Sequence, residues 1–122
     1  MTKTESAVFV VGAFDVQLAQ QKGERQGAQI ETAGLITFAL PQNTVLFDKA
    51  TSAFRVTFVA EGERRKDAYF APGDSSWNCE LSVHSLAAWV ATLASPLQKE
   101  LRLESGSSGA FVNAYLLASG GR

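Results

Sequence analysis

A hairpin signal near the C-terminus most constrains what this chain can fold into. In residues 99–104, Lys-Glu-Leu-Arg-Leu-Glu, Leu101 and Leu103 alternate with charged neighbours. This period of two is typical of a strand with one buried face. Residues 105–109, Ser-Gly-Ser-Ser-Gly, have the composition of a turn, and residues 111–118 are largely apolar on both faces. The stretch therefore predicts a β-hairpin whose second strand is covered on both sides.

The rest of the chain reads mainly as short strands separated by turn signals. Residues 53–60 show the clearest alternation, with Phe54, Val56 and Phe58 on one side. Polar residues 20–29 predict an exposed loop, and Gly12 predicts a bulge or a close backbone approach within the first strand region. Strands are predicted at 7–19 (interrupted at Gly12), 30–40, 45–47, 53–60, 67–71 and 77–83, with charged residues 61–67 joining 53–60 to 67–71 in a hairpin.

One segment, residues 85–94, fits two structures. Leu86, Trp89, Val90 and Leu93 follow the i, i+3, i+4, i+7 spacing of a helix, which Ser85 could cap. The same residues also suit a buried strand. Pro96 ends the segment in either case.

Composition limits the class of protein. The chain has 122 residues, is 46% hydrophobic and carries a formal net charge of −1, which suits one globular domain. The charge lacks the basic excess of a dedicated nucleic-acid binder. A single cysteine, Cys79, excludes an internal disulfide and suggests a reducing compartment. No apolar run reaches the roughly 20 residues of a membrane span, and the N-terminus lacks a signal-peptide pattern. Residues 119–122 are read as the start of a linker.

Catalytic, metal and cofactor sites are not predicted. Cys79 and His84 are the only residues of their types, and their spacing in a strand puts them on opposite faces, so a buried structural cysteine is favoured. One Cys and one His do not make a zinc centre. Residues 105–109 lack the lysine and the following helix of a phosphate-binding loop. We therefore expect a protein without enzymatic activity.

The one basic cluster is Arg64, Arg65 and Lys66. These three cations could contact an acidic peptide or phosphates, and they are the predicted partner-contact residues. A solvated turn is the alternative interpretation. Aromatic residues could serve as stacking platforms for bases, although most occupy positions that suit a core: Tyr69, Phe70, Trp77 and Trp89.

Several stretches, taken in order, resemble the nucleoplasmin-like domain of nuclear histone chaperones and of some nuclear FK506-binding prolyl isomerases. Residues 99–118 are similar to the leucine-rich strand, Ser/Gly turn and closing strand that end such domains. Residues 8–13 resemble the first strand of the family, and residues 54–70 with the turn at 72–74 resemble its central hairpin. The strand at 77–83 follows in the expected place. The alanine- and serine-rich texture is similar to the divergent version in kinetoplastid nucleolar RNA-binding phosphoproteins.

The resemblance implies an all-β fold, an antiparallel β-sandwich of the eight-stranded jelly-roll type, over residues 1–122. It implies a homo-oligomer, a pentamer, acting as the core of a nuclear or nucleolar chaperone in ribosome biogenesis or histone handling. Its partners would be histones or ribosomal and nucleolar proteins, with RNA bound through regions outside this segment. The acidic tract that family members use to hold basic partners such as histones is absent from this segment. The same resemblance favours a strand over a helix at residues 85–94.

The alternative from another class is an OB-like domain that binds single-stranded nucleic acid. Such a domain would have a helix at residues 85–94, between its third and fourth strands. It also needs exposed aromatic side chains beside a basic groove, which the near-neutral charge of the chain disfavours.

Overall fold

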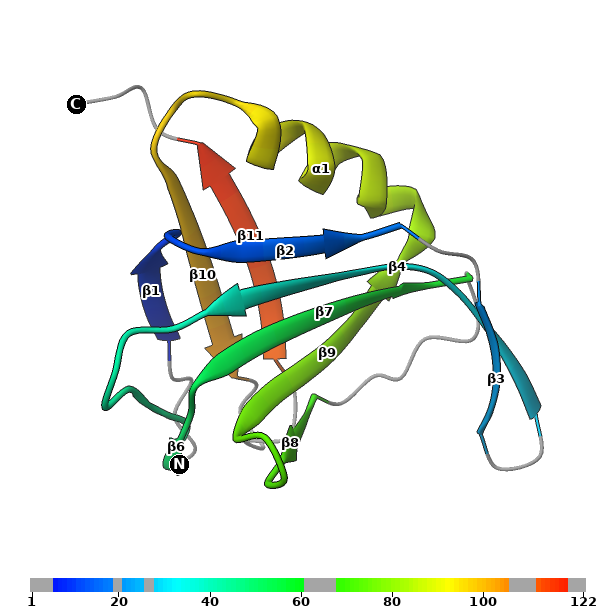
Figure 1. Ribbon diagram of the computed structural model, residues 1–122, viewed down its shortest axis with the longest axis horizontal. Coiled ribbons are helices and arrows are strands. Elements are labelled where there is room, and N and C mark those ends of the chain that lie inside the picture. Colours follow the sequence, from blue (N-terminus) through cyan, green and yellow to red (C-terminus); the bar gives the residue numbers. More distant parts are fainter. Residues whose placement is uncertain (1–5, 19–20, 26–27, 61–67, 106–111, 119–122) are drawn as a thin grey trace.

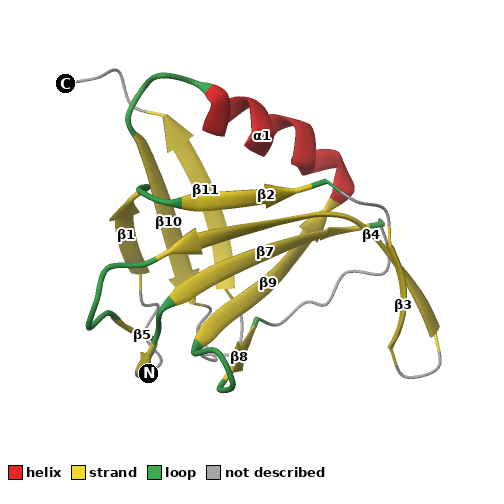
Figure 2. Ribbon diagram, in the orientation of Figure 1, coloured by secondary structure: helices red, strands yellow, loops and turns green. Residues whose placement is uncertain are grey.

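The structure is a computed structural model that describes residues 6–18, 21–25, 28–60, 68–105 and 112–118. Strands dominate it, as Figure 2 shows, and the all-β class is confirmed. In chain order the elements are β1 (Ser6–Val10), β2 (Phe14–Gln17), β3 (Gln21–Arg25), β4 (Ala28–Ala39), β5 (Val45–Leu46), β6 (Lys49–Ala50), β7 (Ala53–Val59), β8 (Tyr69–Ala71), β9 (Ser76–Ser82), the 3-10 helix η1 (Val83–Ser85), α1 (Leu86–Ala94), β10 (Lys99–Ser105) and β11 (Val112–Ala118).

Two sheets face each other across the core, with α1 lying across one end (Figure 1). The larger sheet has six strands in the order β2-β4-β7-β9-β8, with β3 also paired to β4. The smaller sheet has three strands in the order β1-β10-β11. A two-stranded ribbon, β5-β6, completes the described strands.

Gly12 lies where the chain passes from one sheet to the other. β1 pairs with β10 in the small sheet, whereas β2 pairs with β4 in the large one. A Cβ built at Gly12 would meet nothing within 4 Å, so the predicted close backbone approach is absent there. A glycine at a sharp bend between sheets is the better explanation, because it relaxes the backbone where the strand turns a corner.

The large sheet is mixed, which corrects the antiparallel prediction. β7 and β9 run parallel, in the register Phe54↔Trp77 and Val56↔Cys79. β8 pairs antiparallel with the far side of β9. The predicted hairpin between 53–60 and 67–71 is therefore wrong, because β9 lies between these two strands. Alternation along each strand gives its faces but not its neighbour, so sequence spacing favoured the nearer partner.

Residues 86–94 form helix α1, so the preference for a strand at 85–94 is wrong. The helical spacing decides the structure because it puts Trp89 and Leu93 on one buried stripe. Ser85 occupies the N-cap position but its side chain makes no capping hydrogen bond. Ser82 Oγ instead accepts from the His84 backbone N–H, at 3.2 Å, at the start of η1.

The prediction of an exposed loop at residues 20–29 is wrong for most of this segment. β3 pairs with the first half of β4 in a hairpin that projects beyond the rest of the large sheet (Figure 1). The described register runs from Gln21↔Thr32 to Arg25↔Ala28. The polar composition of this segment reflects exposure of a projecting ribbon and not absence of structure.

The core is built from the inward positions of both sheets and from α1. Phe38, Phe54 and Phe58 of the large sheet are almost fully buried. Leu101 and Leu103 of β10 face them from the small sheet, as their alternation predicts. The rings of Phe38 and Phe58 lie 6.2 and 5.9 Å from the Trp89 ring, in tilted and edge-on geometry, which seats the helix on the core.

The predicted C-terminal hairpin is confirmed as the antiparallel pair β10-β11, with Leu101↔Leu116 and Leu103↔Ala114 on the inner face. Of the turn predicted at 105–109, Ser105 is the last residue of β10 and residues 106–109 lie outside the described residues. Among the described residues, cover on both sides of β11 is not found, since Tyr115 and Leu117 on its outer face are 44% and 41% exposed.

Candidate binding surface

The outer face of the large sheet, called here the polar face, follows from alternation. Because Phe54, Val56 and Phe58 of β7 point into the core, Arg55 and Thr57 point outward. Cross-strand register then aligns two rows of outward residues. The first row is Asp15, Thr37, Arg55, Asn78 and Tyr69, and the second is Gln17, Leu35, Thr57 and Glu80.

A hydrogen-bonded network organises one end of the polar face. Arg55 Nη1 forms an ion pair with Asp74 Oδ2 and donates to Ser76 Oγ at 3.2 Å. Ser76 Oγ donates to Asp74 Oδ1 at 2.7 Å and accepts from Asn78 Nδ2 at 3.0 Å. Ser76 is fully buried and Asn78 is 7% exposed. No buried side-chain N or O atom of the described residues lacks a partner, so this network is satisfied.

The hydrogen bond from Ser76, reinforced by the one from Arg55, lowers the pKa of Asp74 from its ordinary value of 3.8. The carboxyl is therefore ionised at neutral pH and acts as an acceptor. A carboxylate held in this state is a poor general acid. The chemistry that the network supports is orientation of Arg55 and Asn78 on the sheet surface.

Tyr69 is the aromatic side chain of the polar face. It lies on the short edge strand β8, directly opposite Asn78 on β9, and is 42% exposed. Its side chain is thus partly exposed at the edge of the polar face. Both tryptophans, by contrast, are core residues, Trp77 being 9% and Trp89 8% exposed. The expectation that most aromatic residues fill the core is confirmed for these two.

Charge on the polar face is mixed. Arg55 is neutralised by Asp74, while Asp15 and Glu80 add carboxylates in the two rows. Lys22, on the projecting β3-β4 hairpin, is exposed. The predicted contact residues Arg64, Arg65 and Lys66 lie outside the described residues. In the sequence they occupy the connection between β7 and β8 that leads directly to Tyr69.

Cys79 and His84 are in different environments. Cys79 is a free thiol, 4% exposed, at an inward position of β9 opposite Val56. The prediction of a buried cysteine is confirmed. His84 is exposed in η1. The placement of Cys79 within the hydrophobic core explains its burial as a packing residue.

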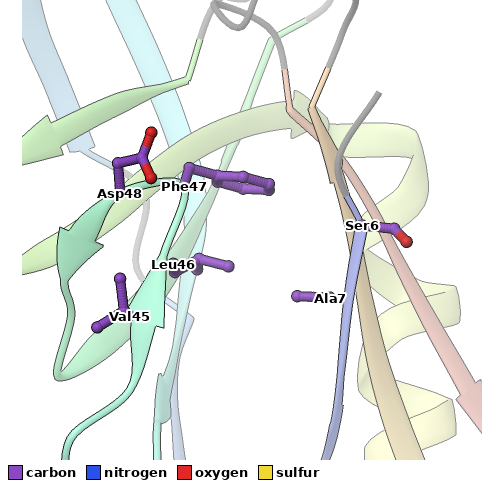
Figure 3. Close-up of a pocket in the computed structure, with 6 residues that line it drawn as sticks. All are labelled: Ser6, Ala7, Val45, Leu46, Phe47 and Asp48. Carbon is purple, nitrogen blue, oxygen red and sulfur yellow. The ribbon is translucent and has the colours of Figure 1, made fainter. Parts of the chain in front are cut away.

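A shallow depression of about 360 Å³ lies between β1 and the β5-β6 ribbon (Figure 3). In Figure 3, Ala7, Leu46 and Phe47 point toward one another across it, whereas Ser6 points away. Asp48 is the charged residue of its lining. The lining offers apolar contact and one carboxylate, with no nucleophile and base in proximity.

The turn beside this depression has unusual backbone geometry. Phe47 and Asp48 have φ values of 49° and 66°, as a two-residue hairpin turn of the primed type requires. Positive φ is costly for a bulky residue, so the turn needs support. The Phe47 ring packs edge-on against Trp77 at 5.7 Å, and Trp77 Nε1 donates to the Leu46 carbonyl at 2.8 Å. These contacts hold the turn in place.

Metal and membrane functions gain no support. Within the described ranges, no group of three or more His, Cys, Asp or Glu side chains is arranged to hold a metal ion. Among the same residues, no helix is long and apolar enough to cross a membrane.

Sequence reasoning missed the network of the polar face. Pro72, Gly73 and Asp74 were assigned to a turn, correctly, but nothing in their spacing indicated a partner for Asp74. The parallel β7-β9 pairing brings Arg55 opposite Asn78 and so next to Ser76 and Asp74. The sequence signal that could have indicated this network is the pair of polar residues Ser76 and Asn78 on a strand that is otherwise rich in core residues.

Comparison with known proteins does not assign this chain to a family. No protein family, no curated protein and no solved structure matches it. Its function must therefore be inferred from the two sheets and their surfaces.

Proposed function

We propose that this domain binds single-stranded nucleic acid on its polar face, in the manner of an OB-like barrel. Helix α1 carries this proposal. It lies between the strands of the large sheet and the β10-β11 hairpin, where the OB-like hypothesis requires a helix. The bend of the first strand at Gly12, which lets β1 and β2 join two sheets, supports the same architecture. The parallel strand β9 is an addition to the five-stranded OB pattern.

The polar face suits a single strand better than a duplex. OB-like domains bind oligonucleotides across the face of their central strands, by stacking bases on aromatic rings and tracking the backbone with cations. Tyr69 supplies a ring, and Thr37 and Thr57 supply hydrogen-bonding groups on the central strands. Lys22 supplies a cation for phosphates. Three more cations come from the segment that precedes Tyr69 in the sequence, namely Arg64, Arg65 and Lys66.

The charge of the chain sets the expected strength of binding. With a net charge of −1, long-range attraction to a polyanion is weak, so affinity depends on stacking and on a few local cations. Contacts from four cations to a single strand correspond to a slope of log affinity against log salt of about −3. A shallow salt slope therefore distinguishes this mode from that of a strongly basic binder.

The test is fluorescence anisotropy of labelled single-stranded DNA and RNA of about 16 nucleotides, the upper site size of one OB fold, against a duplex control. Tyr69→Ala should weaken binding by roughly 5- to 150-fold, as loss of one stacked base predicts. Tyr69→Phe keeps the ring and is the matched control. Replacing Arg64, Arg65 and Lys66 with serine should flatten the salt slope. Absence of single-strand binding at low salt, or equal affinity of Tyr69→Ala and the parent, would refute the proposal.

The nucleoplasmin-like jelly roll is the second candidate. In this second candidate function, the domain would be the core of a pentamer. The pentamer would present acidic or RNA-binding tails to histones or ribosomal components in the nucleus or nucleolus. The exposed apolar outer face of β1-β10-β11 favours some form of self-association. An all-antiparallel jelly roll has no place for the parallel β7-β9 pair, so we rank this function second. A solution mass of five chains without nucleic-acid affinity would reverse the ranking.

A further inference from the structure

The outer face of the small sheet, called here the apolar face, is the second surface of interest. Its apolar side chains are Val8 (51% exposed), Val10 (61%), Tyr115 (44%) and Leu117 (41%). Register aligns them in two adjacent rows across the three strands. One row is Val8, Arg102 and Tyr115, and the next is Val10, Glu100 and Leu117.

These side chains form a patch and are not scattered exposures. Single exposed apolar residues are normal, but adjacent ones across a whole sheet mark an interaction surface. The sequence of β11 is apolar on both faces, as expected of a strand that is covered on both sides. Its inner face packs against the core through Ala114 and Leu116, and the described chain does not cover its outer face.

We propose that the apolar face packs against the same face of a second copy of this chain, forming a two-fold dimer. The charges on β10 select this occupant. Arg102 lies between Glu100 and Glu104 at alternate, outward positions of one strand. A face that carries a cation beside a carboxylate is complementary to itself when one copy is turned end over end.

The arrangement of charged and apolar residues in the two rows also selects the position of the two-fold axis. An axis that crosses the strands midway between the two rows places Arg102 over Glu100 of the second copy, and Glu100 over Arg102. The same rotation places Val8 over Val10 and Tyr115 over Leu117. Within the two rows, every apolar residue then meets an apolar residue, and Arg102 and Glu100 each meet the opposite charge.

Other arrangements of the two faces are poorer. An axis parallel to the strands would place Arg102 on Arg102 and Glu100 on Glu100, which is repulsive. An axis shifted toward Glu104 pairs Val8 with Ser6 and Tyr115 with Asn113, because the row of Glu104 is polar. The dimer described here goes beyond nucleic-acid binding and does not depend on it, because the polar and apolar faces lie on opposite sides of the core (Figure 1).

Sedimentation velocity and light scattering over a dilution series test the dimer. The full chain should show a mass of twice 13.1 kDa at the higher concentrations. Arg102→Glu and Glu100→Arg should each weaken association on the order of 100-fold, because each creates two like-charge contacts per dimer. The double variant Glu100→Arg/Arg102→Glu keeps the net charge and should restore association to within about threefold of the parent. Lys49→Glu, at an exposed position of β6, matches the charge change of Arg102→Glu and should leave association unchanged.

Rescue by the double variant supports the proposed register, since a merely unfolded variant would not be rescued by a second reversal. A single-chain mass at every concentration would overturn the dimer. So would a mass of five chains, or a two-chain mass that neither charge reversal reduces.

Discussion

The two outer faces of this domain differ in how their polar groups are satisfied. On the polar face, Arg55, Asp74, Ser76 and Asn78 bind one another, and the aromatic Tyr69 lies beside them. On the apolar face, four apolar side chains surround the alternating charges of β10. A surface whose polar groups are already paired with one another is stable in contact with water, and it can bind a solvated ligand. A surface that exposes Val8, Val10, Tyr115 and Leu117 gains free energy by meeting protein.

Both faces depend on the core between them, so the largest effect should come from Trp89→Ala. The ring contacts Phe38 and Phe58 and seats α1, and removing a buried tryptophan costs about 3–5 kcal/mol. Chemical denaturation should show this loss, together with weaker binding on both faces. Trp89→Phe should lose less. An unchanged midpoint for Trp89→Ala would mean that α1 is not part of the core.

The two exposed tyrosines give the sharpest test of the difference between the faces. Tyr69 and Tyr115 have nearly equal exposure, 42% and 44%, on opposite sheets. Tyr69→Ser should weaken single-strand binding by about 1–3 kcal/mol and leave self-association unchanged. Tyr115→Ser should weaken self-association and leave the binding of nucleic acid by each chain unchanged. Equal effects of both substitutions in both assays would show that the faces are not functionally distinct.

Ser76→Ala should disturb only the polar face. The hydroxyl is fully buried and bonds Asp74, Arg55 and Asn78, so its loss removes hydrogen bonds to the buried Asn78 amide and to the more exposed Asp74 and Arg55, at a cost of about 0.5–1.5 kcal/mol. Ser52→Ala is the matched control, because Ser52 Oγ donates to the Asp74 carbonyl at an exposed position. Urea unfolding should separate the two variants. Equal stability would indicate that the network contributes little.

The pH dependence of stability gives the smallest effect. The folded-state pKa of Asp74 lies below its ordinary value of 3.8, so its contribution to stability is complete above that value. The contribution is lost as the pH falls through the lowered pKa. The stability difference between the parent and Asp74→Asn should therefore shrink on acidification below 3.8. A difference that does not change with pH would show that the Arg55 and Ser76 contacts do not favour the ionised carboxyl.

Periodicity predicted the faces of the strands well and their partners poorly. The alternation of Leu101 and Leu103 with charged neighbours gave both the hairpin and its inner face, because both are properties of neighbouring residues. The parallel pairing of Phe54 with Trp77 depends on which of several compatible strands packs best, and local spacing does not contain this. The resemblance favoured a strand where Trp89 and Leu93 already indicated a helix, and the periodicity proved right.

The candidate sites could be predicted only in part. The basic cluster of Arg64, Arg65 and Lys66 was visible in the sequence and lies outside the described residues, whereas the position of Tyr69 opposite Asn78 follows only from the pairing of β8 with β9. The apolar face was hidden because an exposed Val8 and a half-buried, inward-facing Phe9 look alike in a continuous apolar run. Register with β10 separates them, by setting Val8 beside Arg102 and Phe9 beside Leu101.

The pairing of β1 with β10 also bears on how the chain is made. Ser6 pairs with Glu104, so β1 leaves the ribosome long before its partner strand is synthesised. Contacts of such separation form slowly, and the small sheet cannot assemble until β10 has emerged. Until then β1, Ser-Ala-Val-Phe-Val, exposes an uncharged edge. Synthesis should therefore be the stage at which this protein is most prone to aggregate, and slowing translation after β10 should raise its soluble yield.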